Sequence, residues 1–521
     1  MIEYLPPGDQ WDMTLLNDLL DEIEHGSVNI VVIPGRYWFD KLDEINRKIE
    51  SYENVLVVIT GDEEALFPTE QLEHSNMIVW VQSPHSDSPR YADRYFPIGY
   101  TPKTRSDLTR PDKSLRYFFG GQVTHARRKK CVRELRQMRN GVLVETKGFN
   151  QGLEPDIYNV NMRLAYTVPC PSGAVIPDTF RLYEALEAGC VPIADNRDPK
   201  GGSKNYFQFL FDTDELPFPT IEEWADLPGT TDYFVDTFPR CQNRCFGWWQ
   251  KQKWLMKRNL QADINKLRKE QPIGNATTVL IPTSPIGSHP DTAIIEETIA
   301  SVRYHLPEAE ILVMIDGVRP QQEHYRASYE QYVNRLLWIT NRQKNIIPIL
   351  FNEHQHQAKM TRETLKLVDT PTILFVEHDT PLVVDYKIPM KELTQTILDD
   401  KADVIRFHHE AAIHPEHEHL MVDSEPDDLF LPMLRTAQWS QRPHLANTEY
   451  YRKLISENIH QDAKTMIEDA VHGITQEKWL KQGRPGWNQH RIWIYAPEEN
   501  MKRSYHLDGR GDDPKFEMEG L

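Results

Sequence analysis

Acidic residues follow an apolar run in the second half of the chain. Glu377 and Asp379 flank His378 directly after residues 372–376, which have the apolar, β-branched composition of a buried strand. Side chains at positions i and i+2 of an extended segment point the same way, so Glu377 and Asp379 can share one ion. A divalent cation held by one or two carboxylates can neutralise charge that develops on a diphosphate leaving group. The two carboxylates therefore predict a Mn²⁺ or Mg²⁺ site.

Three further strand-like runs of the same half end in polar residues, namely Thr283 with Ser284, Asp316, and Asn352. In an open α/β sheet, ligands bind outside the carboxyl ends of the strands. An isolated Asp-Gly after a strand is usually only a turn, and an isolated acidic strand end is usually solvated. Four polar strand ends in one domain instead predict a ligand site, in which Asp316 contacts a nucleoside base or ribose.

The most specific string in the chain is PCPSGAVIPDTFRLYEALEAGCVPI, residues 169–193. It predicts a loop, a helix capped by Asp178 or Thr179, a glycine stop and a buried strand. The free N–H groups and the positive dipole end of such a helix suit a diphosphate. Arg181 and Glu184 share one face of this helix, either as an i, i+3 ion pair or as a donor site with Glu184 on ribose hydroxyls.

A basic helix is expected after the apolar run 115–119 and the pair Gly120-Gly121. Its basic residues are Arg127, Arg128, Lys129, Lys130, Arg133, Arg136 and Arg139. Most of them are expected to form a solvated face, with a nucleic-acid patch as the alternative. Arg127 or Arg128, beside the glycine pair, is the predicted contact to an anion.

Strand-like runs and amphipathic helices alternate through most of the chain, which predicts parallel sheets with helices on both faces. We expect one Rossmann-type half in residues 1–110, a second in residues 111–270, and a further α/β domain in residues 271–521. The predicted fold class is therefore α/β, a two-Rossmann module followed by another α/β domain. A helix at 244–270 is expected to cross back or link domains with its tryptophans packed inward.

Composition narrows the class of protein. The 521 residues include 59 Lys and Arg against 78 Asp and Glu, a formal net charge of −19. This charge disfavours a protein that binds nucleic acid or anionic membranes over its whole surface. No run approaches the roughly 18–20 apolar residues of a membrane helix, and the first residues lack the pattern of a signal peptide.

The chain has five cysteines, an odd number, which argues against a disulfide framework. We expect packed free thiols, Cys241 and Cys245 included, rather than zinc ligands. With the missing signal pattern, this predicts a cytoplasmic protein.

The strand ends of residues 271–521 resemble those of the GT-A nucleotide-sugar transferases. Glu377-His378-Asp379 is similar to the D-x-D motif of that family, with Glu in place of the first Asp. The resemblance implies a divalent cation on Asp379 and Glu377, with His506 as a third ligand. The donor contacts that it implies are Thr283, Ser284, Asp316, Lys359 and Arg362. The pair Glu468 and Asp469 resembles the acceptor base of inverting enzymes, with Asp469 the first choice.

Residues 169–193, together with Phe118-Phe119-Gly120-Gly121-Gln122, resemble the donor site of exostosin-type GT-B glycosyltransferases. The donor contacts implied by this resemblance are Arg127, Arg128, Ser172, Asp178, Arg181 and Glu184. Such a site needs no metal, because a helix dipole and arginine replace the cation. Its acceptor base is expected within residues 1–110, with Asp40 and Glu64 as candidates.

The order of the two resemblances predicts a bifunctional glycosyltransferase with two active sites. Unlike the relatives of the secretory pathway, the chain shows no membrane anchor, which implies an enzyme of a bacterium or of the host cytosol of a virus. Each would move a sugar from a nucleotide-sugar donor to the hydroxyl of a glycan or other acceptor, and only the second would need a divalent cation. Two alternatives stay open. One module could be an acceptor-binding scaffold, or the acceptor could be a modified DNA base, which is the only role foreseen for nucleic acid.

Overall fold

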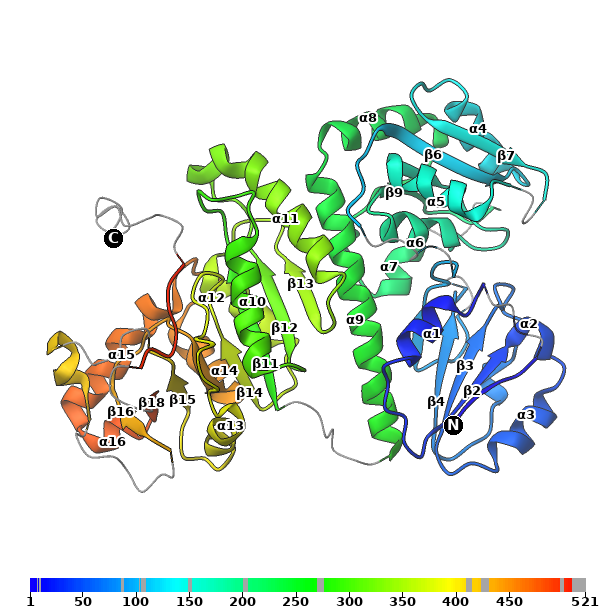
Figure 1. Cartoon of the computed structure of the whole chain (residues 1–521). Coiled ribbons are helices and arrows are strands. Elements are labelled where there is room, and N and C mark those ends of the chain that lie inside the picture. Colours follow the sequence, from blue (N-terminus) through cyan, green and yellow to red (C-terminus); the bar gives the residue numbers. More distant parts are fainter. Residues whose placement is uncertain are drawn as a thin grey trace. The chain divides into compact units, whose positions relative to one another are not determined.

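The computed structural model describes residues 1–6, 8, 11–85, 89–102, 104, 109–148, 152–199, 205–268, 276–408, 415–422, 431–496 and 501–507. The chain divides into two compact units, Met1–Pro272 and Ile273–Leu521 (Figure 1). Both are α/β, as the sequence predicts. Among the described helices, none is both long and apolar enough to cross a membrane.

The first unit opens with a five-stranded parallel sheet in the order β1-β2-β3-β4-β5. Its strands are β1 (Ile2–Tyr4), β2 (Asn29–Pro34), β3 (Val55–Thr60), β4 (Met77–Gln82) and β5 (Arg94–Phe96). Alternate residues of the central strands face opposite sides, because successive side chains of a strand point to opposite faces. Ile30 and Val32 pack with the leucines of α1 (Thr14–Leu20). Val31 and Ile33 pack with α3 (Leu42–Ile49).

A second five-stranded parallel sheet follows, in the order β10-β9-β8-β6-β7. Its strands are β6 (Leu115–Gln122), β7 (Val142–Thr146), β8 (Ala165–Cys170), β9 (Val191–Asp195) and β10 (Thr220–Ile221). The chain leaves β6 toward one edge of the sheet and leaves β8 toward the other edge. The gap between β6 and β8 is therefore a topological switch point, the place where α/β sheets bind ligands.

Helices of this second sheet are α4 (Ala126–Leu135), α5 (Pro155–Leu164), α6 (Phe180–Glu187), α7 (Tyr206–Phe211) and α8 (Leu227–Asp236). The short helix α2 (Gly35–Trp38) belongs to the first sheet. Both α4 and α6 begin just after β6 and β8 respectively. Their N-termini consequently lie at the carboxyl edge of the sheet, next to the switch point.

The 29-residue helix α9 (Arg240–Arg268) packs on both sheets of the first unit (Figure 1). Trp249 donates to Glu187 of α6 at 2.7 Å. Asp263 accepts from Trp80 of β4 at 3.0 Å and from Arg94 of β5 at 2.7 Å. The predicted helix is thus confirmed, since α9 crosses back from the second sheet to the first. Trp249 is fully buried. Residues 269 and 270 of the predicted span lie outside the described residues.

The second unit is built on one eight-stranded sheet in the order β13-β12-β11-β14-β17-β15-β18-β16. Its strands are β11 (Thr277–Thr283), β12 (Glu310–Ile315), β13 (Ile346–Leu350), β14 (Thr372–Phe375), β15 (Val404–Arg406), β16 (Met433–Arg435), β17 (His444–Asn447) and β18 (Ile492–Tyr495). The four strands β11 to β14 run parallel, whereas β17 is antiparallel to β14 and β15. The switch point of this sheet lies between β11 and β14.

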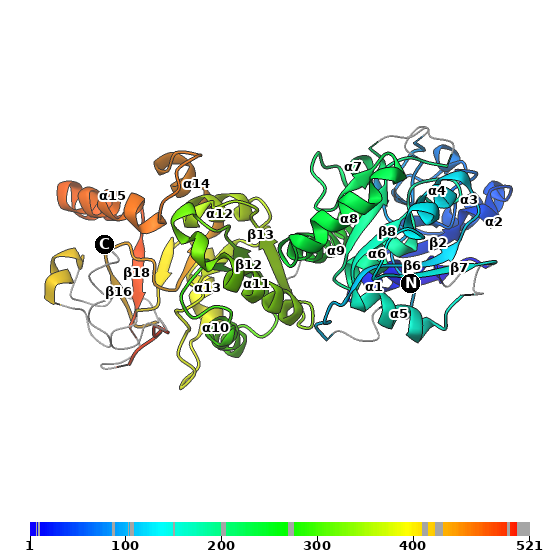
Figure 2. The same cartoon turned by 90° about the horizontal axis from the view of Figure 1, so that it is seen from above.

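Helices cover both faces of this sheet. Figure 2 shows α10 (Ala293–His305), α11 (Arg326–Thr340) and α13 (Met390–Leu398) on one face. It shows α12 (His356–Leu365), α14 (Thr448–Asn458) and α15 (Ile467–Gln482) on the other, and α16 (Arg484–Trp487) follows α15. The helix expected from Asp291 begins two residues later, and Asp291 accepts from the N–H of Ala293 at 2.8 Å.

The five cysteines are free and buried, so the prediction of packed thiols is confirmed. Cys241 lies 3.2 Å from the hydroxyl of Thr237, and Cys245 donates to the carbonyl of Pro217.

Candidate functional site

The crevice at the switch point of the second sheet brings two helix N-termini together. β6 ends in Gly120-Gly121, and α4 starts behind its N-cap, His125. The loop after β8 leads to α6, whose N-cap is Thr179. A Cβ on Gly121 would lie 2.2 Å from a guanidinium nitrogen of Arg181, so a larger residue there would require that side chain to move. The glycine pair thus makes room for a cationic side chain at the crevice.

Arg128 and Arg181 place two guanidinium groups in this crevice. Arg128 donates to the carbonyls of Ser172 at 3.0 Å and Gln122 at 3.3 Å. Arg181 donates to the carbonyl of Gly120 at 2.7 Å, and its guanidinium carbon lies 4.4 Å from the ring centre of Phe119. Neither has a carboxylate within ion-pair distance in the part of the chain that the structure describes.

Burial, together with the neighbouring charge of Arg181, lowers the pKa of Arg128 to about 10. Arg181 is buried and Arg128 is half-buried. Two like charges that are withdrawn from water without a counter-charge destabilise a fold, because each ion loses hydration. A bound anion would remove that cost. The crevice therefore has the electrostatics of an anion site.

Four buried polar atoms around the same crevice have no hydrogen-bond partner among the described residues. They are the hydroxyls of Ser172 and Thr179, Nε of Arg181 and Nδ1 of His125. Buried polar groups are nearly always bonded in folded proteins. Hydroxyls and N–H groups at two helix N-termini are the donors that a phosphate accepts from.

Arg127, the neighbour of Arg128, lies in a different environment. Its Nε donates to both oxygens of Asp195 at 2.8 and 2.6 Å, and the pair is buried. Residues i and i+1 of a helix point about 100° apart, so Arg127 turns to the sheet while Arg128 turns to the crevice. Of the two predicted contacts, Arg128 is therefore the one that reaches the crevice.

Asp178 is used within the fold. Its carboxylate accepts from Tyr183 at 2.5 Å, from Ser83 at 2.8 Å and from the N–H of Ile98 at 2.9 Å. Burial raises its pKa. Because Ser83 and Ile98 follow strands of the first sheet, Asp178 joins the two sheets at the crevice. Because these bonds use both of its oxygens, Asp178 turns neither of them toward a bound ligand in this arrangement.

Glu184 likewise has internal partners. It accepts from the hydroxyls of Thr101 at 2.6 Å and Tyr158 at 3.0 Å. Arg181 and Glu184, both described, form no ion pair. The i, i+3 alternative from the sequence is thus replaced by two separate sets of contacts.

Glu63, which the sequence analysis did not single out, lies across the crevice. It follows β3, and its Oε2 lies 3.8 Å from the position of a Cβ on Gly173, in the loop after β8. Burial is the main cause that raises the pKa of Glu63 to about 7. The candidate Glu64 is exposed and lies 3.9 Å from Arg36, and Asp40 is exposed too. A search for polar residues just after β3, like the one made for the strands of residues 271–521, would have found Glu63.

The switch point of the second unit gathers carboxylates. Glu377 accepts from the side-chain amide of Gln357 at 2.8 Å, and the oxygen of Gln357 accepts from the N–H of Ile467 at 3.1 Å. This relay links β14 to the first turn of α15, which carries Glu468. Burial raises the pKa of Glu377 to about 8, with Asp379 and Glu468 adding to the effect. The predicted Glu377, Asp379 and Glu468 are thus brought together.

His378 lies apart from that group. Its carbonyl accepts from Thr298 of α10 at 2.7 Å, and its ring is buried close to His289. The neighbours on either side of it, Glu377 and Asp379, interact with each other. This separation is what alternation along an extended segment predicts.

Glu468 and Asp469 have different surroundings. Glu468 is half-buried and accepts from the N–H of Gln441 at 3.0 Å. Asp469 is exposed, with no hydrogen bond to any described residue. Glu468 is therefore the one of the pair that interacts with Glu377.

His506 reaches the same edge from the end of the chain. Its Nε2 lies 3.5 Å from Oδ2 of Asp379, and Leu507 donates its N–H to the carbonyl of Asp379 at 2.7 Å. Across the described ranges, no group of three or more His, Cys, Asp or Glu side chains is arranged to hold a metal ion. Asp379 and His506 fit a two-ligand site, since a carboxylate oxygen and an imidazole nitrogen face each other there.

Thr283 and Ser284 end β11 beside this group. The hydroxyl of Thr283 lies 2.8 Å from that of Tyr332. Burial raises the pKa of Tyr332, and the charge of Asp379 adds to the rise. Tyr332 thus connects Thr283 with Asp379, while Ser284 is half-buried at the strand end.

Asp316 has a different use from the one predicted. Its Oδ1 accepts from the N–H groups of Gly317 at 2.8 Å and Gln355 at 2.7 Å. Its Oδ2 accepts from the N–H of His356 at 3.1 Å and pairs with the ring of His354 at 2.8 Å. A carboxylate offers about four lone-pair sites, so none is left for a nucleoside. Asp316 holds the loop before α12 instead.

Lys359 and Arg362 face α14 and the loop that follows it. Lys359 lies 3.8 Å from Asp462. Arg362 donates to the carbonyls of Ile455 and His460 at 3.2 and 3.1 Å, and also to that of Ile459. Because these carbonyls end a helix, Arg362 caps α14, and no described contact joins it to the carboxylates.

Arg406 is a second residue that the sequence analysis missed. It ends β15, which runs parallel to β14 and so ends at the same edge. The side chain is almost fully buried, and burial lowers its pKa to about 10 while Glu468 opposes the shift. The run 404–406 is too short to stand out as a strand, which is why the rule of polar strand ends did not reach it.

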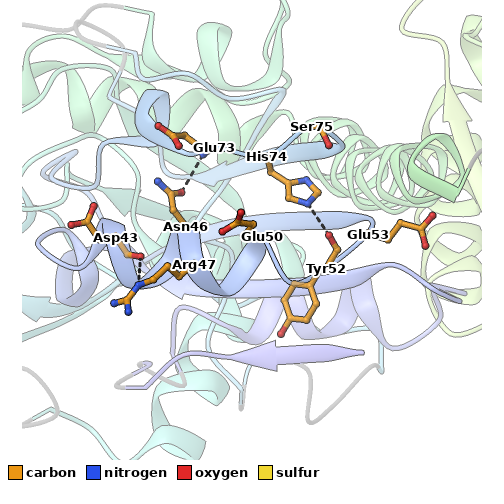
Figure 3. Close-up of a pocket in the computed structure, with 9 residues that line it drawn as sticks. All are labelled: Asp43, Asn46, Arg47, Glu50, Tyr52, Glu53, Glu73, His74 and Ser75. Atoms are coloured by element: carbon orange, nitrogen blue, oxygen red, sulfur yellow. Dashed lines mark hydrogen bonds between the residues drawn. The ribbon is translucent and has the colours of Figure 1, made fainter.

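A hollow of about 930 Å³ lies at the opposite edge of the first sheet (Figure 3). It is lined by Asp43, Asn46, Arg47, Glu50, Tyr52, Glu53, Glu73, His74 and Ser75. Several of its polar groups bond to one another, as when Asn46 accepts from the N–H of Glu73 at 3.1 Å. It borders the amino ends of β3 and β4, whereas α/β sheets bind ligands at carboxyl ends.

No family model and no curated protein matches the sequence. Solved structures that the chain resembles include S. aureus TarS 1-349, at 14% identity and a TM-score of 0.30, over 44% of this chain and 60% of that one. For S. aureus TarS 1-349 in complex with UDP-GlcNAc, the identity is 14% and the TM-score 0.28, over 44% of this chain and 57% of that one. For a UDP-glucose pyrophosphorylase complexed with UDP-glucose, the identity is 10% and the TM-score 0.28, over 44% of this chain and 93% of that one. Such low TM-scores support no conclusion, so the assignment below rests on the residues of the chain.

Proposed function

We propose that the chain is a glycosyltransferase that uses nucleotide-sugar donors and has one donor site in each unit. The observation that carries the proposal is the pair Arg128 and Arg181, half-buried and buried respectively, which lie at a switch point without a carboxylate partner among the described residues. Two helix N-termini and unpartnered hydroxyls surround this pair. A nucleoside diphosphate is an anion of matching charge, and it is the leaving group when a sugar is transferred.

In the first unit, the two guanidiniums and the helix N-termini would hold the diphosphate and stabilise its charge as the bond to the sugar breaks. This needs no metal. The sequence of residues 169–193 supports the proposal through its resemblance to exostosin-type GT-B enzymes. Ser172 and Thr179 would donate to phosphate oxygens, while Asp178 and Glu184 keep the crevice in shape.

In the second unit, Asp379 and His506 would hold a divalent cation, with Glu377 close by. The cation supplies positive charge to the diphosphate. Glu468 or Asp469, at the start of α15, would take the proton of the acceptor hydroxyl. Thr283 and Ser284 would contact the nucleotide from the end of β11, as the GT-A resemblance implies.

The test measures release of nucleoside diphosphate by the full chain from a panel of UDP-, GDP- and TDP-sugars. Assays run in parallel with Mn²⁺ and with EDTA. Two activities, one resistant to EDTA and one dependent on Mn²⁺, support two sites. A single activity would make the other unit an acceptor-binding scaffold. Absence of binding and turnover for the whole panel would refute the function.

A further inference from the structure

Glu63 is the acidic side chain of the first sheet that reaches the crevice of the second. It lies just after β3, and its Oε2 comes within 3.8 Å of the Cβ position of Gly173. Gly173 belongs to the loop between β8 and α6, next to Ser172. A carboxylate on one sheet thus faces the anion site on the other.

Other acidic groups near Glu63 have partners of their own. Asp62 pairs with Arg90 at 2.5 Å and accepts from the N–H groups of Leu66 and Phe67. Asp178 is fully bonded, as described above. Glu63 makes no hydrogen bond or ion pair with any residue in the described ranges. A half-buried carboxyl group that the fold leaves unbonded does not contribute to stability, which is typical of a group kept for function.

The charges that face Glu63 come from both sheets. Asp12 and Glu64 of the first sheet, and Asp178 of the second, disfavour its ionised form, while Arg36 favours it. The guanidinium of Arg128 also interacts with it. Burial is the largest influence, and the balance raises the pKa of Glu63 to about 7. A carboxylate with a pKa near neutrality can both accept and release a proton.

We propose that Glu63 is the general base of the first unit and takes the proton of the acceptor hydroxyl during sugar transfer. The inference rests on the proposed function of that unit. As the acceptor oxygen bonds to the anomeric carbon, its proton passes to the carboxylate of Glu63. The bond between the anomeric carbon and the diphosphate oxygen breaks, and its electron pair stays on the diphosphate, which Arg128 and Arg181 hold.

The experiment uses the full chain with Asp379→Ala, in EDTA, so that only the first unit contributes. Its probes are the nucleotide-sugars that the starting protein turns over, with water as acceptor. For Glu63→Gln we expect turnover to fall about 100-fold or more, the usual contribution of a general base, with unchanged donor affinity. In the starting protein, the rate should rise with pH through an apparent pKa near 7, and Glu63→Gln should lack this limb.

Two further variants guard the interpretation. Glu63→Asp keeps the charge but shortens the side chain, so turnover should fall less and the pH limb should remain. Glu70→Gln removes an exposed carboxylate from the segment between β3 and β4 and should change nothing. Full activity of Glu63→Gln, loss of its donor binding, or loss of turnover in Glu64→Gln instead would overturn the inference. Failure of the unsubstituted chain to bind any nucleotide-sugar would refute the proposed function itself.

Discussion

The two switch points of this chain have the same topology and opposite charge. At the crevice of the first unit, Arg128 and Arg181 have carbonyl oxygens as their partners. At the edge of the second unit, burial raises the pKa of Glu377, and the nearby charges of Asp379 and Glu468 add to the rise. A diphosphate can be neutralised directly by guanidinium groups or through a cation on carboxylates. In both sheets the switch point lies between two parallel strands, so the comparison teaches that this strand arrangement can present either charge at its carboxyl edge.

A large loss of donor affinity is expected when a guanidinium of the first unit is removed. Arg181→Ala should weaken binding of nucleotide-sugars in EDTA by about 100-fold, because a charge-assisted contact to the diphosphate is lost. Calorimetry on the full chain measures it. Arg136→Ala, which removes an exposed arginine paired with Glu145 after the same helix, should bind normally. Equal losses in both variants would mean that general charge, and not the crevice, holds the donor.

The second unit is tested through its carboxylate. Asp379→Ala should abolish the Mn²⁺-dependent release of nucleoside diphosphate and leave the EDTA-resistant release intact, since the two sites neutralise charge independently. Asp385→Ala, an exposed neighbour, serves as the control. Loss of both activities in Asp379→Ala would contradict two independent sites.

A smaller effect separates the two acidic residues of α15. Glu468 interacts with Glu377, whereas Asp469 is exposed. We therefore expect Glu468→Gln to lower Mn²⁺-dependent turnover by about 10- to 100-fold and Asp469→Asn to lower it less. Steady-state rates at saturating donor measure both. A larger loss of turnover in Asp469→Asn than in Glu468→Gln would instead support Asp469 as the acceptor base, which is the choice favoured by the sequence.

The smallest effect is on stability. The folded-state pKa of Glu63 is raised to about 7 from an ordinary 4.5. As pH rises from about 4.5 to 7, the unfolded chain releases this proton first, so the folded state loses up to about 3 kcal/mol of stability. Glu63→Gln removes that loss. We compare the melting temperature of Glu63→Gln with that of the unsubstituted chain at each pH. The difference should be a few degrees more in favour of the variant at pH 8 than at pH 5. If the gain in melting temperature is smaller at pH 8 than at pH 5, the pKa of Glu63 is not raised in the folded state.

Much of the fold follows from the sequence, because buried parallel strands are short apolar runs between amphipathic helices. The strands β2, β3, β11 and β14 are examples. The antiparallel β17 was not foreseen, since its sequence HLAN has no strong pattern and its place depends on distant partners. Tertiary pairing decided what local propensity could not.

The site was predictable to the level of the segment, not of the side chain. The motifs located both crevices, yet the choice between Arg127 and Arg128 depends on which side of α4 faces the sheet. Asp316 was a sound candidate by position, but the loop before α12 supplies N–H groups that use its oxygens. Glu63 and Glu64 are neighbours with opposite exposure. Such differences come from packing, which a single sequence does not reveal.

The central claim is that the chain holds two diphosphate sites that differ in their need for a cation. Titration of the full chain with UDP and with GDP, in EDTA and then in Mn²⁺, counts those sites directly. We predict one equivalent of bound nucleotide in EDTA, lost in Arg181→Ala, and a second that appears only with Mn²⁺ and is lost in Asp379→Ala. Binding of neither nucleotide in EDTA, or one site alone under both conditions, would contradict the account.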